Sequence, residues 1–168
     1  MSKKCGKSAE FALVREERSQ LVVGYGKTKV DGKSLYEWYE VGFNTKKSGK
    51  PTLDQVKQAI FDDINSRTDE KILSGFVWNN KPVWLSAESQ TNFSAAEYTA
   101  STKNGLGLPV TFKLGEQDGT PVYHEFTTVE ELSGFYLQAQ AYIKQCIGEG
   151  WQEKDNIDWE PYEEYFNQ

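Results

Sequence analysis

Short runs of β-branched and aromatic residues, separated by glycines, occupy residues 11–43. The runs FALVREER, SQLVVGYG and SLYEWYEVGF have the composition of strands. Asp31 and Gly32 predict a hairpin turn between the last two runs, because an Asp-Gly pair accepts the positive φ of a tight turn. The segment NTKKSGKP that follows has the content of a connecting loop. We therefore expect an N-terminal β-rich segment over residues 1–50.

Two stretches further along carry the three- and four-residue spacing of apolar side chains that is typical of helices. The first begins after Pro51 and is expected to end near Thr68. Its apolar positions are Leu53, Val56, Ile60 and Ile64. The second covers residues 89–103, and either Ser86 or Ser89 is expected to cap its N-terminus.

A third helix has the clearest signature. Thr127 or Thr128, followed by two glutamates, predicts a capping box at the start of the helix. Gly148 and Gly150 predict its end, since glycine is favoured just past a helix C-terminus. The apolar face consists of Val129, Leu132, Phe135, Tyr136, Ala139, Tyr142, Ile143 and Ile147.

A hairpin is predicted in GFVWNNKPVWL, residues 75–85. Side chains alternate between the two faces of a strand, so an even-length loop around Asn79 and Asn80 fixes which residues share a face. The face expected in the core holds Phe76, Trp78, Val83 and Leu85. Val77 and Trp84 are left on the opposite face, which is either a second packing surface or an exposed patch.

The order of elements predicts the fold class. A second hairpin, turned at Asp118-Gly119, separates the second and third helices. Strands, helix, hairpin, helix, hairpin and helix do not alternate as a parallel sheet requires. We expect an α+β fold of antiparallel β-hairpins packed with three main helices, plus the N-terminal β-rich segment. The core would span residues 51–150, with an acidic aromatic C-terminal tail over residues 151–168.

The tail, WQEKDNIDWEPYEEYFNQ, alternates acidic residues with aromatic ones. Aromatic side chains in such a segment dock either on a partner or back on the parent domain, because apolar groups otherwise stay in water. With the outer face of the first hairpin, the tail supplies the candidate binding surface: Val77, Trp84, Trp159, Tyr162, Tyr165 and Phe166.

The charge distribution restricts the class of partner. The chain has 19 Lys or Arg, 25 Asp or Glu and a formal net charge of -6. Nucleic-acid binding depends on dense cationic contacts to phosphate, so we expect no nucleic-acid partner. No apolar stretch approaches the roughly 20 residues of a membrane span, and we expect no membrane partner and a place in the cytoplasm. Cys5 and Cys146 lie in different contexts, which favours two reduced thiols.

Catalytic and cofactor signatures are absent from the sequence. His124 is the only histidine, so no pair of histidines can hold a metal and no Ser-His-Asp arrangement can form. DNIDWE has clustered carboxylates, but Glu160 stands where a calcium loop starting at Asp155 needs glycine. We expect no cofactor, no metal and no enzymatic activity. An enzyme that uses carboxylates alone stays open, and it requires an acid with a raised pKa in a cleft.

Two segments resemble a known family. ILSGFVWNNKPVWLSAESQTNF is similar to the start of a domain of unknown function, numbered 4376, found at the C-termini of phage tail-fibre proteins and in small prophage-encoded proteins of gut bacteria. The family's Ser-x-x-Gln-x-Asn stretch matches through Ser86, Ser89, Gln90 and Asn92. Its later Thr-x-x-Glu-Leu helix matches through Thr128, Glu131 and Leu132. The resemblance covers about residues 54–150, without the tail.

The resemblance implies a non-enzymatic phage or prophage structural or tail-assembly accessory protein. Its partner would be a phage tail or fibre protein, and the multimeric assembly of many tail parts adds the expectation of a homo-oligomer. The protein would act in the cytoplasm of the bacterial host or within the phage particle. The alternative is a carbohydrate-binding module that uses exposed aromatic side chains such as Trp84.

Overall fold

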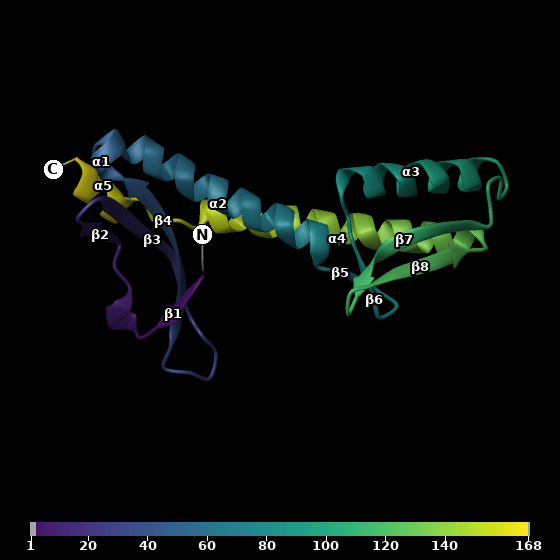
Figure 1. The fold of residues 1–168 in the computed structure, drawn as a ribbon, viewed down its shortest axis with the longest axis horizontal. Helices are drawn as coiled ribbons and strands as arrows, with labels where there is room; N and C mark the ends of the chain where they lie inside the picture. The colour runs from purple at the N-terminus through teal and green to yellow at the C-terminus, as the bar shows by residue number, and fades with distance from the viewer. Residues whose placement is uncertain (1–2, 168) are drawn as a thin grey trace. The chain divides into compact units, whose positions relative to one another are not determined.

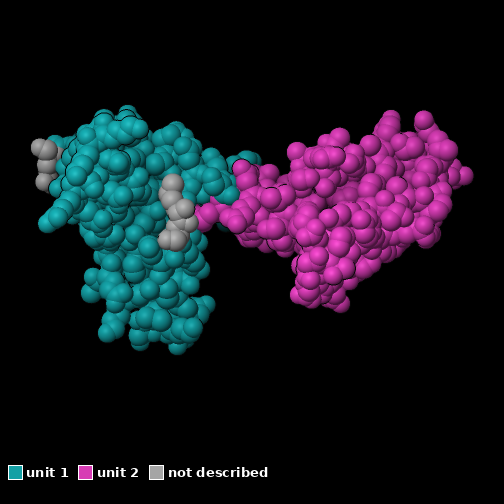
Figure 2. Space-filling view, viewed as in Figure 1, with its two compact units in different colours: residues 1–66, 150–168 teal, residues 67–149 magenta. Residues whose placement is uncertain are grey.

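The structure is a computed structural model that describes residues 3–167. Strands and helices form two compact units, which Figure 2 shows in separate colours. Unit 1 comprises residues 1–66 and 150–168, and unit 2 comprises residues 67–149. Both boundaries fall inside helices, whereas the segments expected from the sequence end at residues 50 and 150. The α+β class and the antiparallel hairpins predicted from the sequence are confirmed.

Unit 1 is built on a four-stranded antiparallel sheet with the order β1-β4-β3-β2 (Figure 1). The strands are β1 (Lys4–Gly6), β2 (Val14–Glu17), β3 (Gln20–Lys29) and β4 (Tyr36–Asn44). A short 3-10 helix, η1 (Ser8–Glu10), follows β1, and α1 (Thr45–Ser48) follows β4. The expected turn between the long strands contains Gly32 at φ 69°.

Helix α2 (Leu53–Ser74) packs its apolar side chains against the sheet to form the core of unit 1. Thr52 and Gln55 form a capping box at its start, with hydrogen bonds of 3.3 Å and 2.9 Å in the two directions. The buried core side chains come from α2, the sheet and α5 (Glu160–Phe166): Val56, Ile60, Ile64, Leu21, Val23, Tyr25, Val41 and Tyr162. The expected helix end near Thr68 was wrong, because helical residues continue until Gly75 follows the last turn.

Unit 2 has two hairpins, two helices of its own and the last turns of α2. Its elements are β5 (Phe76–Trp78), β6 (Lys81–Val83), α3 (Ala87–Thr102), β7 (Val110–Gln117), β8 (Thr120–Phe126) and most of α4 (Val129–Asp155). Asn79, Asn80, Asp118 and Gly119 all have positive φ, so both hairpins turn where the sequence predicts.

Helices α3 and α4 cover the inner face of the β7-β8 hairpin (Figure 1). Phe93 of α3 meets Phe112 of β7 with ring centroids 4.9 Å apart, and Phe135 of α4 meets Phe126 of β8 at 5.0 Å. The predicted core face of the first hairpin joins them, since Phe76, Trp78, Val83 and Leu85 are all buried. These large side chains stabilise the unit by roughly 2 kcal/mol or more each through burial.

The end of α4 differs from the sequence expectation. The helix passes through Gly148 and Gly150 and ends at Asp155. A glycine inside a helix costs only about 1 kcal/mol relative to alanine, so neighbouring packing decides the outcome. Gly150 is itself buried, and beyond it Lys154 Nζ donates to Asn65 Oδ1 at 2.5 Å. Within residues 3–167, no helix is both long enough and apolar enough to cross a membrane.

Candidate functional site

The outer face of the β5-β6 hairpin presents two of the six candidate residues. Val77 pairs with Pro82 across the strands, and Trp84 lies two residues beyond Pro82 on the same face. Val77 is 60% exposed and Trp84 is 38% exposed. The strand alternation that buries Phe76 and Val83 therefore leaves these side chains in solvent.

Contacts with the second hairpin extend this face. The backbone N–H of Trp84 donates to the carbonyl of Leu114 at 2.7 Å, which fixes the end of β6 beside β7. Lys113 Nζ lies 5.3 Å from the centroid of the Trp84 ring. Lys113 pairs in turn with Tyr123 of β8, which is 59% exposed. We call this set of residues the hairpin surface: Val77, Pro82, Trp84, Lys113 and Tyr123.

A glycine allows the two hairpins to approach so closely. A Cβ atom added at Gly115 would lie 2.7 Å from the carbonyl oxygen of Pro82 and 3.5 Å from the Trp84 ring. Real Cβ atoms do not approach a backbone oxygen at the shorter distance, so a larger residue at this position would push β6 away from β7.

His124 lies beneath the hairpin surface and joins it to α4. Its ring packs edge-on against Trp78, with centroids 4.8 Å apart, and Lys81 Nζ is 2.9 Å from Nδ1. An ammonium group can only donate, so Nδ1 accepts and the Nε2–H donates to Glu131 Oε1 at 2.8 Å. Glu131 is also in the capping box of α4, where its N–H donates to Thr128 Oγ1 at 3.2 Å.

The other candidate residues lie in unit 1 and dock on their own domain. Tyr162 is 4% exposed, and its hydroxyl donates to the carbonyl of Gly24 at 2.8 Å. Burial, followed by the charge of Asp158, raises the pKa of Tyr162 to about 12. The Trp159 ring meets Phe61 edge-to-face, with centroids 5.8 Å apart. Of the two destinations that the sequence left open for the tail, the parent domain is the one observed.

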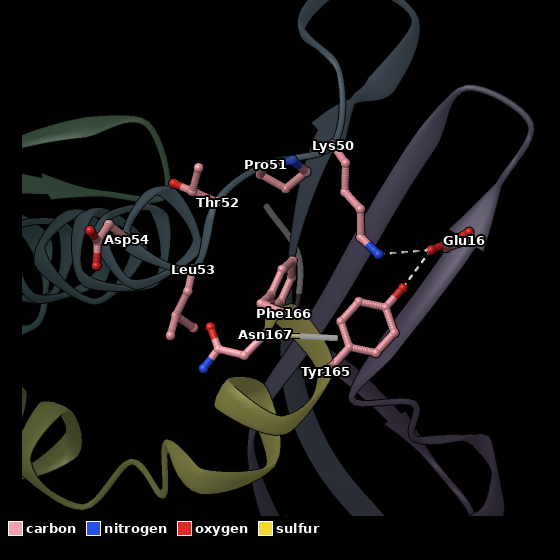
Figure 3. Close-up of a pocket in the computed structure, with 9 residues that line it drawn as sticks. All are labelled: Glu16, Lys50, Pro51, Thr52, Leu53, Asp54, Tyr165, Phe166 and Asn167. Carbon is pink, nitrogen blue, oxygen red and sulfur yellow. Dashed lines mark hydrogen bonds and ion pairs between the residues drawn. The ribbon is translucent and has the colours of Figure 1, made fainter.

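Tyr165 and Phe166 close one side of a cavity of about 800 Å³ at the start of α2. Figure 3 shows the Lys50 ammonium group and the Tyr165 hydroxyl directed at the Glu16 carboxylate. The hydroxyl donates to Glu16 at 2.5 Å, and Lys50 Nζ is 3.6 Å from the same oxygen. This hydrogen bond and then the charge of Lys50 lower the pKa of Glu16. The same hydrogen bond raises the pKa of Tyr165, against the opposing charge of Lys50. The charged groups of Glu16 and Lys50 at the border of the cavity are thus paired with each other.

Another groove of unit 1 was not predicted from the sequence. It has a volume of about 570 Å³ and runs along β3 beside the segment 153–162. A bulge interrupts β3 between Tyr25 and Thr28, and Gly26 inside it has φ 63°. The closely spaced glycines of GYGKT were the available signal, but they do not indicate that the C-terminal segment would form the opposite wall.

Metal-ligating side chains and cysteines are the residues that metal or redox chemistry would use. No group of three or more His, Cys, Asp or Glu side chains within residues 3–167 could hold a metal ion. Both cysteines are free thiols, Cys5 exposed and Cys146 buried. A disulfide between them was not expected from the sequence, and these environments agree with that expectation.

Comparison with known proteins places most of the chain in one family. No curated protein and no solved structure matches it significantly. A family model described as a domain of unknown function, DUF4376, matches residues 55–167. The match extends through α5, so the expectation that the tail lies outside the family was wrong; strands β1 to β4 precede the matched region. The chain therefore belongs to the DUF4376 family.

Proposed function

We propose that this protein is a non-enzymatic phage or prophage structural or tail-assembly accessory protein that acts through protein contacts, and that the hairpin surface is its contact site. The phage context comes from the resemblance found in the sequence. The partner would be a tail or fibre protein, met in the cytoplasm of the bacterial host or within the particle.

The observation that carries the proposal is the exposure of large side chains on a fixed scaffold. Val77, Trp84 and Tyr123 are each more than a third exposed. Val77 and Tyr123 lie on paired strands, and the backbone N–H of Trp84, just past β6, is bonded to Leu114. Protein interfaces are enriched in aromatic residues, and a few such residues supply most of the binding energy. Side chains on paired strands lose little further freedom on binding, which favours affinity.

The environments of His124, Glu16 and Glu149 support a non-enzymatic role. Both ring nitrogens of His124 are engaged by Lys81 and Glu131. Hydrogen bonds lower the pKa values of Glu16 and Glu149. These shifts are the reverse of the raised pKa that a general acid needs.

Carbohydrate binding is a second candidate, favoured by the exposed ring of Trp84. A sugar would stack on the flat face of that ring. Lys113 Nζ lies over the ring, at 5.3 Å from its centroid, and would have to move to admit a sugar there. Protein contact therefore has more support than carbohydrate contact.

The test uses the full-length chain, tagged and expressed during prophage induction in the source bacterium. Gradient-purified particles and the unbound lysate are analysed by mass spectrometry for the chain and for proteins that co-purify with it. We expect a tail or fibre protein to co-purify with the wild type and with Trp151→Ala, a matched control because Trp151 is 64% exposed outside the hairpin surface. Co-purification should fall at least about tenfold for Trp84→Ala combined with Tyr123→Ala.

Recovery of no tail protein with the wild type, or equal recovery with the double variant, would contradict the proposal. Carbohydrate binding, the second candidate, is tested with the purified chain on a glycan array and by tryptophan fluorescence titration. A response lost in Trp84→Ala, without a protein partner, would favour carbohydrate binding.

A further inference from the structure

Strand β8 (Thr120–Phe126) is an edge strand of unit 2. Its neighbour β7 is engaged on both sides, because it pairs with β8 and the carbonyl of Leu114 accepts the backbone N–H of Trp84. Among residues 3–167, no strand other than β7 pairs with β8, and no backbone group outside β7 is hydrogen-bonded to it. The N–H and C=O groups of successive residues in a strand point to opposite sides, so about half of those in β8 have no backbone partner.

The usual protection of an edge strand is weak in β8. Natural edge strands are often very short, or carry Lys or Pro residues that prevent pairing with another chain. Strand β8 has 7 residues and contains no Lys or Arg. Its one proline, Pro121, is the second residue, so the part from Val122 to Phe126 retains every backbone N–H. Both Tyr123 and Glu125 are exposed on this part of the strand. The edge is therefore long enough for a short strand of another chain to pair with it.

The charges around β8 select a basic partner. Residues 114–143 contain no Lys or Arg. The acidic residues of this stretch are Glu116, Asp118, Glu125, Glu130 and Glu131. Two lysines reach the region from neighbouring strands, and both are engaged: Lys113 pairs with Glu116 at 2.9 Å, and Lys81 Nζ lies 2.9 Å from His124 Nδ1.

Three of these acids have no cationic partner. Within residues 3–167, Asp118, Glu125 and Glu130 form no ion pair, whereas Glu131 accepts from His124. Asp118 lies in the turn before β8, Glu125 lies within the strand, and Glu130 lies in the first turn of α4 after it. A strand added to β8 therefore meets negative charge at the start, the middle and the end of the edge, which favours a basic sequence and opposes an acidic one.

The alternation of side chains along β8 defines what the added strand must present. Tyr123 and Glu125 are two residues apart and share the outer face of the strand. Side chains of an added strand that lie directly opposite them come within about 5.5 Å, Cβ to Cβ. A Lys or Arg opposite Glu125 forms a favourable cross-strand pair, and a β-branched or long side chain packs beside the Tyr123 ring. The partner segment is therefore extended, basic and rich in β-branched residues.

We propose that β8 binds an extended, basic segment of a protein partner as an additional strand, paired through the free edge of Thr120–Phe126. The inference rests on the proposed function in one respect, which is that the segment belongs to the protein contacted by the hairpin surface. Tyr123 belongs to both sites, so an added strand continues the hairpin surface beyond β8. Backbone pairing supplies affinity in this mode, and the charges supply the preference for a basic sequence.

The first experiment titrates the full-length chain with a synthetic peptide in which threonine and lysine alternate over about nine residues. Binding is measured by NMR, and the dissociation constant should lie below about 1 mM. Amide hydrogen exchange should slow in β8, at the residues whose N–H groups face away from β7. The same peptide with glutamate in place of lysine is the charge control and should not bind.

Two further peptides test the backbone pairing itself. One carries N-methyl groups on its threonines and the other on its lysines, and an N-methylated amide cannot donate a hydrogen bond. Only one of these two sets of N–H groups faces the neighbouring strand when the peptide is paired. One methylated peptide should therefore bind as the parent does, and the other should lose at least about tenfold in affinity.

A variant of the chain tests the selection by charge. Glu125→Lys reverses the charge in the middle of the edge and should raise the dissociation constant of the threonine-lysine peptide about tenfold. Glu164→Lys is the matched control, because Glu164 is an exposed residue of α5 in unit 1 and the substitution changes the net charge equally. It should leave the dissociation constant within about twofold of the wild type. Circular dichroism establishes that both variants are folded.

Strand addition would be overturned by a threonine-lysine peptide that does not bind, by equal binding of the glutamate peptide, or by equal binding of the two methylated peptides. Slowed exchange confined to residues outside β8 would overturn it as well. The particle test of the proposed function fails separately. Loss of a tail protein in Trp84→Ala combined with Tyr123→Ala, without peptide binding, refutes strand addition alone. Peptide binding at β8 without any tail protein in the particle test supports strand addition and refutes the phage assignment.

Discussion

The C-terminal aromatic segment of unit 1 and the first hairpin of unit 2 carry similar side chains but use them differently. Trp159, Tyr162 and Tyr165 lie against the sheet and α2 of their own unit. Val77 and Trp84 lie in solvent, because strand alternation directs their neighbours into the core. Aromatic content alone does not identify a binding surface. An aromatic side chain stays exposed only where the fold has no second apolar face to pack against it.

The largest effect expected from this difference is on stability. Tyr162→Ala removes a buried ring and a hydrogen bond to Gly24, and should lower the free energy of unfolding of unit 1 by about 4 kcal/mol. Trp84→Ala should lower that of unit 2 by less than about 1 kcal/mol. Urea unfolding followed by circular dichroism measures both. Equal losses would remove the distinction between docked and exposed aromatic residues.

A smaller effect is expected from alkaline pH. The pKa of Tyr162 is about 12 in the folded state and about 10 in the unfolded chain, so the folded state favours the neutral hydroxyl. This contribution is complete below pH 10 and is lost as the pH rises to 12. Unfolding measured over this range should show a loss of about 3 kcal/mol from Tyr162. In Tyr162→Phe the loss of stability due to Tyr162 should vanish. The loss due to Tyr142, whose pKa is also about 12, should remain.

The hairpin surface can be tested through its supporting glycine. Gly115→Ala places a Cβ atom against the carbonyl oxygen of Pro82 and should lower the free energy of unfolding by about 2 kcal/mol. It should also weaken partner capture, because Trp84 would shift relative to Lys113. Gly134→Ala in α4 is the matched control: its Cβ meets no atom within 4 Å, and it should stabilise by about 0.5 kcal/mol. A neutral Gly115→Ala would mean that the two hairpins are not held so closely.

The smallest effect concerns the exposed end of the tail. Tyr165→Phe removes the hydroxyl that donates to Glu16, and the carboxyl pKa of Glu16 should move back toward its ordinary value. The unfolding midpoint should not change measurably, since a hydrogen bond in solvent contributes little. NMR titration of the Glu16 carboxyl group follows the pKa. No change there would show that Lys50 alone lowers it.

Local signals along the chain predict most of the helices and strands but not how the strands pair. The turns at Asn79-Asn80 and Asp118-Gly119 depend on neighbouring residues, and both were predicted correctly. Of the two caps proposed for α3, Ser86 or Ser89, the structure shows Ser86. Strand β1 was not predicted, because KCG has little strand preference and forms only by pairing with β4. The end of α4 was misplaced because its packing outweighs the preference of glycine for helix ends.

The candidate site was predicted in the same partial way. Alternation placed Val77 and Trp84 on an outer face, and both are exposed. Lys113 and Tyr123 were missed, because they join that face only through the hydrogen bond from Trp84 to Leu114, a contact between residues far apart in the chain. The docking of the tail was left open, since it depends on packing against the sheet and α2 of unit 1, contacts between residues far apart in the chain.

The position of His124 gives the molecule an internal reporter. As the only imidazole in the chain, it produces a single set of ring-proton NMR signals, and the nearby rings of Trp78 and Phe126 displace those signals by their ring currents. Any ligand or partner that shifts the β5-β6 hairpin against α4 must alter these signals. Binding at the hairpin surface can therefore be followed without an attached label.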